Sequence, residues 1–91
     1  LIACPERYAD IARALGENVE GLSTTASAQK AIERIKALGL SIGIPENLTV
    51  LGVKEEDLEV MSVNAKKDAC QLTNPRKATL NEVIQIFKSA L

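Results

Sequence analysis

Residues 68–82 read DACQLTNPRKATLNE, and this stretch lies where one helix must end and another begin. Pro75 has no amide hydrogen and disfavours the helical region for Asn74, so the preceding helix has to stop by about Thr73. A polar loop therefore separates two helices. Such a loop is either an ordinary connection or one that closes over a site. The first interpretation is favoured because most loops of this kind only connect elements.

The last helix carries its own start signal. Thr79 is followed three residues later by Glu82, the pattern of a capping box in which each side chain accepts a hydrogen bond from the other residue's backbone amide. Apolar residues then recur at helical spacing, namely Leu80, Val83, Ile84, Phe87 and Leu91. We expect a helix from Thr79 to Leu91.

A first helix is predicted from Pro5 to about Leu15. Proline fits the first helical position, where its missing amide is not needed, and Gly16 suits the left-handed residue that follows a last turn. The buried face is expected to hold the residues at three- and four-residue spacing, which are Tyr8, Ile11, Ala12 and Leu15.

A second, longer helix is predicted from about Thr25 to Ile42. It follows three alternative N-cap residues, Ser23, Thr24 and Thr25, and it is ended by Gly43 and then Pro45. Its apolar residues at helical spacing are Ala28, Ile32, Ile35, Leu38 and Ile42. On the solvated face Lys30 and Arg34 flank Glu33, and we expect them to pair with it.

A third helix is predicted from about Glu55 to Cys70 on its charge order. Carboxylates crowd its start and lysines its end, as the helix dipole favours: Glu55, Glu56, Asp57 and Glu59, then Lys66 and Lys67. The acidic cluster is interpreted as dipole compensation, since it lacks the alternate ligands and central glycine of a calcium loop. The apolar stripe comprises Leu58, Met61, Ala65 and Ala69, broadened by Val60 and Val63. The preceding stretch, residues 49–53, has some strand character but no partner strand, and it is interpreted as a packed connector.

These elements predict an all-α fold with about four helices in an irregular array. A chain of 91 residues forms one domain with a modest core. Hydrophobic residues make up 46% of it, yet only Tyr8 and Phe87 are aromatic, and much of the apolar content is alanine. So many small side chains predict closely packed helices.

The overall charge excludes several classes of partner. Eleven basic and twelve acidic residues leave a formal charge of -1, with neither sign gathered in one half, so a general electrostatic grip on nucleic acid is not expected. Two aromatic residues cannot build a stacking platform for single strands. No apolar run reaches the roughly 18–20 residues of a membrane span. Neither nucleic acid nor a membrane is a predicted partner.

The two cysteines, Cys4 and Cys70, lie near opposite ends, and the sequence has no histidine. We expect free thiols in a reducing cytoplasm rather than a disulfide, and no metal site built from this chain. Catalysis by these residues alone is not expected either, because general acid–base chemistry usually recruits histidine. The start at Leu1, apolar and without methionine, suits a piece excised or processed from a longer protein.

The order of several short motifs resembles the C-terminal part of the iron-containing (group III) alcohol dehydrogenases. The likeness covers essentially all 91 residues, and its most specific part runs from Asn74 to Thr79. In chain order the motifs are Ala14-Leu15-Gly16, Ala31-Ile32, Ile44-Pro45 with Leu48, Gly52-Val53 before Glu55-Glu56-Asp57-Leu58, Ala65 with Asp68, Asn74-Pro75-Arg76, Thr79, Glu82 and Ala90-Leu91.

The resemblance implies a two-domain parent enzyme, in which an N-terminal domain binds the dinucleotide and residues 1–91 are part of a C-terminal all-helical domain. It implies a divalent metal, Fe²⁺ or Zn²⁺, and NAD or NADP, with alcohol and aldehyde interconverted by hydride transfer. The family's metal ligands, one aspartate and three histidines, are implied to lie upstream. The rest of the dehydrogenase chain is then the partner. This piece alone is expected to be inactive, with no catalytic, cofactor-binding or metal-binding residue.

The resemblance also implies a place for the loop between the last two helices. In the related enzymes the matching loop approaches the mouth of the interdomain cleft, so Cys70, Asn74 and Arg76 are candidates for the edge of the substrate pocket. Several relatives have two small residues before the Asn-Pro-Arg motif, where this chain has Leu72 and Thr73. The alternatives are a helix-flanking surface charge for Arg76 and a rigid turn for Asn74 with Pro75.

A second hypothesis comes from another class of protein. The chain is then a free-standing helical module that binds a protein partner through an exposed apolar face. Both hypotheses expect uncovered hydrophobic surface, through which self-association is plausible. The reading frame upstream of Leu1 distinguishes them, because a histidine-bearing helical region and a dinucleotide-binding half support the dehydrogenase, whereas a start codon just before Leu1 supports the module.

Overall fold

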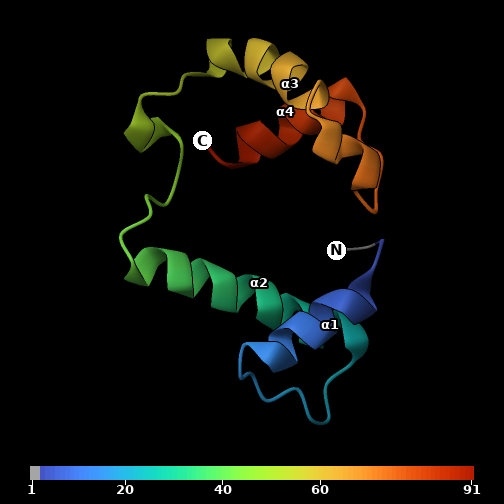
Figure 1. Ribbon diagram of the computed structural model, residues 1–91. Coiled ribbons are helices and arrows are strands. Elements are labelled where there is room, and N and C mark those ends of the chain that lie inside the picture. Colours follow the sequence, from blue (N-terminus) through green and yellow to red (C-terminus); the bar gives the residue numbers. More distant parts are fainter. Residues whose placement is uncertain (1–2) are drawn as a thin grey trace. The chain divides into compact units, whose positions relative to one another are not determined.

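The computed structural model describes residues 3–91. The regular structure in that range is helical, with α1 (Pro5–Ala14), α2 (Thr24–Ser41), α3 (Leu58–Lys66) and α4 (Leu80–Ser89), and with short 3₁₀ turns η1 (Thr49–Leu51), η2 (Glu55–Asp57) and η3 (Ala69–Thr73) (Figure 1). The predicted all-α fold with about four helices is confirmed. The start at Leu1, which suggested a longer protein, lies outside the described residues.

The helices form two pairs. The chain divides into two compact units, one that ends at Ile44 and one that begins at Pro45. In the first unit α1 packs on α2, and in the second α3 packs on α4 (Figure 1). Each unit therefore has a buried contact of its own.

Small side chains make the contact in the first unit. Its buried residues are Ala9 and Ala12 of α1 and Ser27, Ala28 and Ala31 of α2. Side chains of this size let two helix axes approach closely. The predicted use of alanine in close helix packing is thus confirmed for this pair.

The ends of both helices in the first unit follow local signals. Gly16 adopts the left-handed conformation after α1, with φ 86°. Of the three candidate N-caps, Ser23 caps α2, and its hydroxyl accepts from the Ala26 amide at 3.1 Å. The predicted helices, Pro5 to about Leu15 and Thr25 to Ile42, agree with α1 and α2 to within one residue at each end.

The apolar face of α2 extends beyond the contact. Ile35 is 52% exposed and Ile42 is 67% exposed, and Ile11 on α1 is 41% exposed although the sequence predicted it buried. For α2 the reason is a difference in length, because α1 has 10 residues and α2 has 18, and the buried residues of α2 all lie in its first half. The expectation of uncovered hydrophobic surface is confirmed.

The predicted pairing of Glu33 with Lys30 and Arg34 is not found in the described part of the chain. Arg34 instead lies near Glu17 in the loop after α1, with 4.0 Å between its Nε and the carboxylate Oε1. Both side chains are partly exposed, so this contact contributes little to stability. Glu33 directly precedes Arg34, and adjacent residues of a helix do not face each other, so Glu17 is the better placed partner.

A larger side chain anchors the second unit. Leu58 and Ser62 of α3 and Val83 of α4 are buried. Ser62 is fully buried, and its hydroxyl has no hydrogen-bond partner among the described residues. The two ends of the unit are also joined, because the Leu48 amide donates to the Ala90 carbonyl and the Thr49 hydroxyl to the Leu91 carbonyl, each at 2.7 Å.

The prediction of one helix from Glu55 to Cys70 is wrong at both ends. The start, η2, is a 3₁₀ turn in which Asp57 Oδ2 accepts from the Lys54 amide at 2.9 Å. At the other end Asp68 is extended, with ψ 131°, and its carboxylate accepts from the Cys70 amide at 2.8 Å. A short polar side chain that bonds a nearby amide competes with the helix, so α3 stops and η3 begins.

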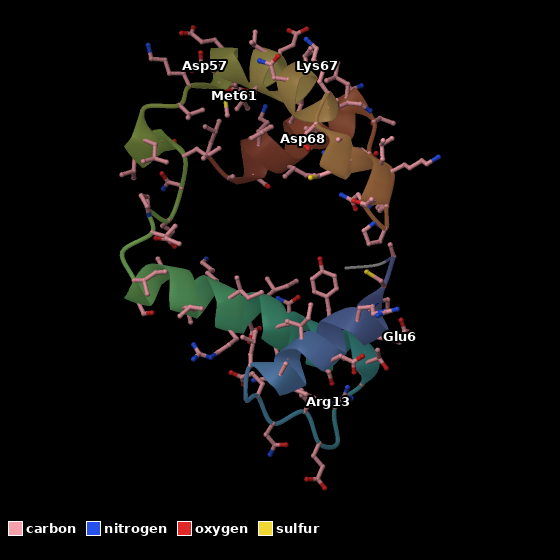
Figure 2. The ribbon with its side chains drawn as sticks, in the orientation of Figure 1. Glu6, Arg13, Asp57, Met61, Lys67 and Asp68 are labelled. Atoms are coloured by element: carbon pink, nitrogen blue, oxygen red, sulfur yellow. The ribbon has the colours of Figure 1, made fainter. Side chains whose placement is uncertain are left out.

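The charge order predicted for α3 is nevertheless present. Figure 2 shows Asp57 at the start of α3 and Lys67 beyond its end. The apolar stripe is narrower than predicted, because Val60 is 65% exposed. The stretch 49–53 is a connector without strand structure, but its description as packed is wrong, since Val50 and Leu51 are exposed.

Candidate functional site: the loop between α3 and α4

The candidate loop begins with the turn η3. Asp68 caps this turn through the Cys70 amide, and the Thr73 hydroxyl donates to the Cys70 carbonyl at 3.1 Å. The hydrogen bond from the Cys70 amide lowers the pKa of the Asp68 carboxyl below its usual value, and a smaller contribution comes from a hydrogen bond with the Cys70 thiol. The Cys70 thiol therefore lies beside a carboxylate at the start of the turn.

Asn74 and Pro75 then redirect the chain. Asn74 is extended, with φ −67° and ψ 131°, as the following proline requires. Its side-chain Oδ1 accepts from the Arg76 amide at 3.1 Å, which closes a local turn. The predicted stop of helical structure at Thr73 is confirmed, because η3 ends there.

The capping box at the start of α4 is confirmed. Thr79 Oγ1 accepts from the Glu82 amide at 3.2 Å, and Glu82 Oε2 accepts from the Thr79 amide at 2.8 Å. The other oxygen of the same carboxylate, Oε1, accepts from Arg76 Nη2 at 2.9 Å. The Thr79 amide, and to a lesser extent the Arg76 guanidinium, hold the pKa of Glu82 below its usual value.

A second tie reaches the loop from α3. Lys66 Nζ donates to the Ala78 carbonyl at 2.7 Å. Beside this bond lies an open hollow of about 360 Å³, lined by Lys66, Gln71, Leu72, Lys77 and Ala78. The loop is thus fastened to the helix before it as well as to the helix after it.

All of the candidate pocket-edge residues, Cys70, Asn74 and Arg76, are exposed and lie on this loop. The structure joins Asn74 to Arg76 through the side-chain Oδ1 and the backbone amide, and it places Cys70 with Asp68 instead. Both cysteines are free thiols, as predicted. Arg76 is exposed and pairs with Glu82 in the first turn of α4, an arrangement that also fits the alternative interpretation of a helix-flanking surface charge.

Two of the groups that fasten the loop were not identified from the sequence. Glu82 was recognised as a capping residue, but the capping pattern uses only one of its carboxylate oxygens. Lys66 was assigned to the helix dipole, and nothing in its spacing indicates the Ala78 carbonyl as its partner. A basic residue six positions before a capping glutamate, as Arg76 is here, is the one signal that was available.

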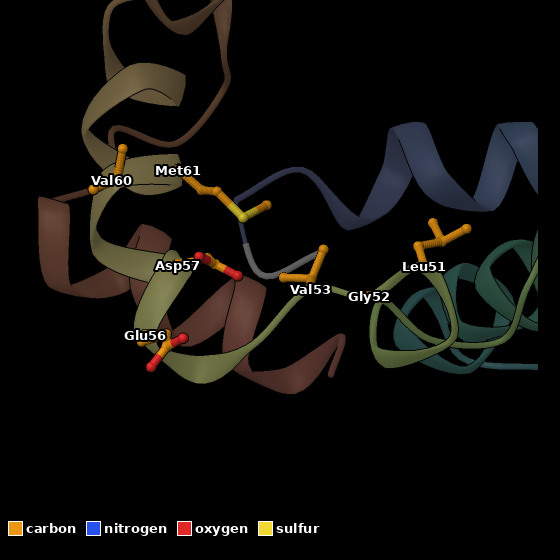
Figure 3. A pocket seen from close by; sticks show the side chains of 7 residues that line it. All are labelled: Leu51, Gly52, Val53, Glu56, Asp57, Val60 and Met61. Atoms are coloured by element: carbon orange, nitrogen blue, oxygen red, sulfur yellow. The ribbon is translucent and has the colours of Figure 1, made fainter.

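Another hollow, of about 400 Å³, lies beside η2 and the start of α3 (Figure 3). It is lined by Leu51, Gly52, Val53, Glu56, Asp57, Val60 and Met61. Its two carboxylates are engaged with one residue, because Asp57 accepts from the Lys54 amide and Glu56 lies 3.8 Å from the Lys54 ammonium. This hollow brings together no set of reactive groups.

The residues present do not fit a metal site. Between residues 3 and 91 no three His, Cys, Asp or Glu side chains gather closely enough to hold an ion. The acidic residues around η2 have protein partners. Glu55 Oε1 lies 2.7 Å from Lys88 Nζ, and the Asp57 carboxylate accepts a hydrogen bond from the Lys54 amide. No helix in the same range combines the length and apolar character needed to cross a membrane.

Comparison with known proteins gives the family. The whole chain, residues 1–91, matches the family described as Fe-containing alcohol dehydrogenase family, C-terminal. This chain belongs to that family. The resemblance inferred from the order of its motifs is therefore confirmed, and the all-helical fold is that of the C-terminal domain of the Fe-containing alcohol dehydrogenases.

Several members of the Fe-containing family are closely similar to this chain. It is 50% identical over 91 residues to the NAD-dependent methanol dehydrogenase of Bacillus methanolicus, covering 100% of this chain and 24% of that protein. It is 50% identical over 90 residues to the 1,3-propanediol dehydrogenase of Klebsiella pneumoniae, and this match covers 99% of this chain and 23% of that protein. The solved structure of a 1,3-propanediol oxidoreductase matches with a TM-score of 0.97 at 49% identity, covering 100% of this chain and 24% of that chain. The chain spans about a quarter of the length of these relatives.

Proposed function

We propose that these residues form part of the C-terminal helical domain of a metal-dependent, NAD(P)-linked alcohol dehydrogenase, which interconverts alcohols and aldehydes by hydride transfer. The observation that carries this proposal is the match along the whole chain, at 50% identity, to an NAD-dependent methanol dehydrogenase. The rest of that dehydrogenase chain is the partner and supplies the dinucleotide-binding domain.

In this proposal the chain forms one wall of the cleft between the two domains and is inactive by itself. The metal, Fe²⁺ or Zn²⁺, and the nicotinamide are bound by residues outside this chain and supply Lewis-acid and hydride chemistry. The support is chemical, because the 91 residues include no histidine, and the described ones present no cluster of metal ligands. The contribution of this part is then to shape the pocket.

The loop between α3 and α4 lies at the edge of the substrate pocket in this proposal, with Cys70, Asn74 and Arg76 on it. Three features support the assignment. The loop is polar and exposed, it is fastened at Ala78 and at Arg76, and it presents a thiol beside the Asp68 carboxylate. Fastened loops on a helical scaffold are suited to positioning a substrate.

Calorimetry of the isolated 91-residue chain tests whether the metal and the cofactor are bound by residues outside it. Titration with Fe²⁺, Zn²⁺ or NAD⁺ is expected to give no heat of specific binding, because the groups that hold them lie elsewhere in the enzyme. The control is the full-length dehydrogenase, which should bind both the metal and the cofactor. Micromolar affinity of the isolated chain for any of the three would contradict the proposal.

The rival function is a free-standing protein-interaction module. The exposed apolar residues in the second half of α2, Ile35, Leu38 and Leu40, are compatible with either function, since both expect uncovered hydrophobic surface. The reading frame upstream of Leu1 decides between the two. A start codon immediately before Leu1 would support the module. Sedimentation of the isolated chain adds a check, since a monomer at high concentration would count against a large exposed hydrophobic patch.

A further inference from the structure

The Glu82 carboxylate does more than cap α4. A capping box needs only one oxygen, and here Oε2 takes the Thr79 amide at 2.8 Å. The second oxygen, Oε1, accepts from Arg76 Nη2 at 2.9 Å. One side chain in the first turn of the helix thus holds both ends of the segment from Arg76 to Thr79.

The same segment is restrained from two other directions. Lys66, the last residue of α3, donates through Nζ to the Ala78 carbonyl at 2.7 Å. Asn74 Oδ1 accepts from the Arg76 amide at 3.1 Å, which fixes the backbone just before the guanidinium. Residues 74–79 are therefore held to both helices of the second unit, whose contact includes the buried Val83.

The pair leaves part of the guanidinium available. Arginine carries five N–H donors in a planar fork, and the described contacts of the Arg76 guanidinium use one nitrogen, Nη2. Its side chain is 63% exposed, against 43% for Glu82. An arginine held on one side and open on the other presents its remaining donors in a defined direction.

We propose that Glu82 is a positioning residue, which acts through Arg76 to set the direction of the guanidinium and the course of residues 74–79 at the edge of the substrate pocket. The proposal rests on the function proposed above, which places Arg76 at that edge. Glu82 itself touches no substrate in this scheme. Its effect is on substrate binding and not on the chemical step.

The test uses the full-length dehydrogenase with NAD⁺ and, as probe substrates, methanol and 1,3-propanediol. The variants are Arg76→Ala, Glu82→Gln and the double variant. Glutamine keeps an oxygen for the Thr79 amide, so the helix cap survives while the charge that orients Arg76 is lost. The matched control is Glu55→Gln, which removes a carboxylate from another exposed pair, the 2.7 Å contact with Lys88 toward the other end of α4.

Each single variant is expected to raise KM for the better of the two probe alcohols about threefold, with kcat changed by less than about twofold. The double variant should be no worse than Arg76→Ala alone, because the two residues act as one unit. Amide hydrogen exchange in residues 74–79 should be faster in Glu82→Gln. The control should leave all three readouts unchanged.

Other results separate the two proposals. If Arg76→Ala raises KM and Glu82→Gln does not, or if the two effects multiply in the double variant, the positioning role is wrong and the pocket-edge proposal stands. If Arg76→Ala leaves KM unchanged, the pocket-edge proposal fails and the positioning role with it. Unchanged hydrogen exchange in Glu82→Gln overturns the positioning role whatever the kinetics show. Where Arg76→Ala does not fold, Arg76→Lys replaces it, since lysine lacks the planar fork.

Discussion

The two helix pairs of this chain are held together by different kinds of contact. In the first unit the contact consists of small side chains, and four of its five buried residues are alanines. In the second unit a leucine and a valine are buried, and polar bonds distant in sequence join the ends: Leu48 to Ala90, Thr49 to Leu91, and Lys88 to Glu55. The contact in the first unit depends on the close approach of two helices with small side chains. The contact in the second unit depends on larger buried side chains and on hydrogen bonds that join the ends of the unit.

This difference explains where the candidate site lies. A pair of helices held by alanines leaves its larger apolar residues uncovered, such as Ile35 on α2 and Ile42 directly after it. Such a face suits contact with another part of a protein. A pair held by polar ties can support a polar loop in one conformation, which is what a pocket edge needs. Substitutions that affect one unit and not the other therefore test this comparison.

The largest effect is expected from Leu58→Ala in the second unit. Leu58 is 2% exposed, and its truncation leaves a cavity, so unfolding should become easier by about 2–5 kcal/mol. Leu72→Ala is the matched control, because it removes the same atoms from a side chain that is 88% exposed. Urea denaturation measures the total loss, and hydrogen exchange should place it in α3 and α4. Equal losses in the two variants would contradict the burial of Leu58.

In the first unit the damaging change is an added volume. Ala28→Leu puts a large side chain into the α1–α2 contact, where Ala28 is fully buried, and it should cost about 1–3 kcal/mol. Ala37→Leu makes the same change at an exposed position of the same helix and should be nearly neutral. The readout is hydrogen exchange of the amides in α1 and α2. Similar exchange in both variants would mean that the helices are not closely packed.

Loss of the α4 cap should have a smaller effect. Thr79→Ala removes the hydroxyl that accepts from the Glu82 amide, at a cost of about 1 kcal/mol. Thr25→Ala is the control, since Thr25 is an exposed threonine in the first turn of α2, where Ser23 is the cap. Thermal denaturation compares the two variants. A control that lost as much stability would show that the hydroxyl of Thr79 has no special role.

The smallest expected effect is a dependence on pH. The Thr79 amide and the Arg76 guanidinium lower the pKa of folded Glu82 below its usual 4.5. Its contribution to stability is therefore present above about pH 4.5 and is lost as the pH falls through the lowered value. For Lys88, hydrogen bonding and charge from Glu55 raise the pKa, so that contribution is fully present below about pH 10.5 and is lost as the pH rises through the raised value.

Stability curves of the parent protein and of Glu82→Gln check the acid limb. The two curves should converge as the pH falls from 4.5 through the lowered pKa of Glu82, because the parent then loses the charge that the variant lacks throughout. A constant gap between them at all pH values would show that ionisation of Glu82 contributes nothing. Glu55→Gln tests the alkaline limb in the same way.

Much of the candidate site was predictable because its signals are local. The stop at Thr73 follows from Pro75, and the start of α4 follows from Thr79 and Glu82, whose hydrogen bonds span three residues. The loop was therefore located from the sequence, whereas its three candidate residues were implied by the resemblance to the family. What fastens the loop was not, because the Lys66 bond to Ala78 spans 12 residues and depends on how α3 lies against α4.

The sequence by itself determined the helical class, the positions of α1, α2 and α4, and membership of the family. Caps, proline and glycine act within one turn of the backbone, so their effects do not depend on the rest of the chain. Tertiary structure alone decided which apolar residues are buried and that Glu82 also binds Arg76. Those outcomes depend on the relative lengths of the packed helices and on competition between nearby and distant hydrogen-bond partners. The spacing of apolar residues in the sequence gives no information about either.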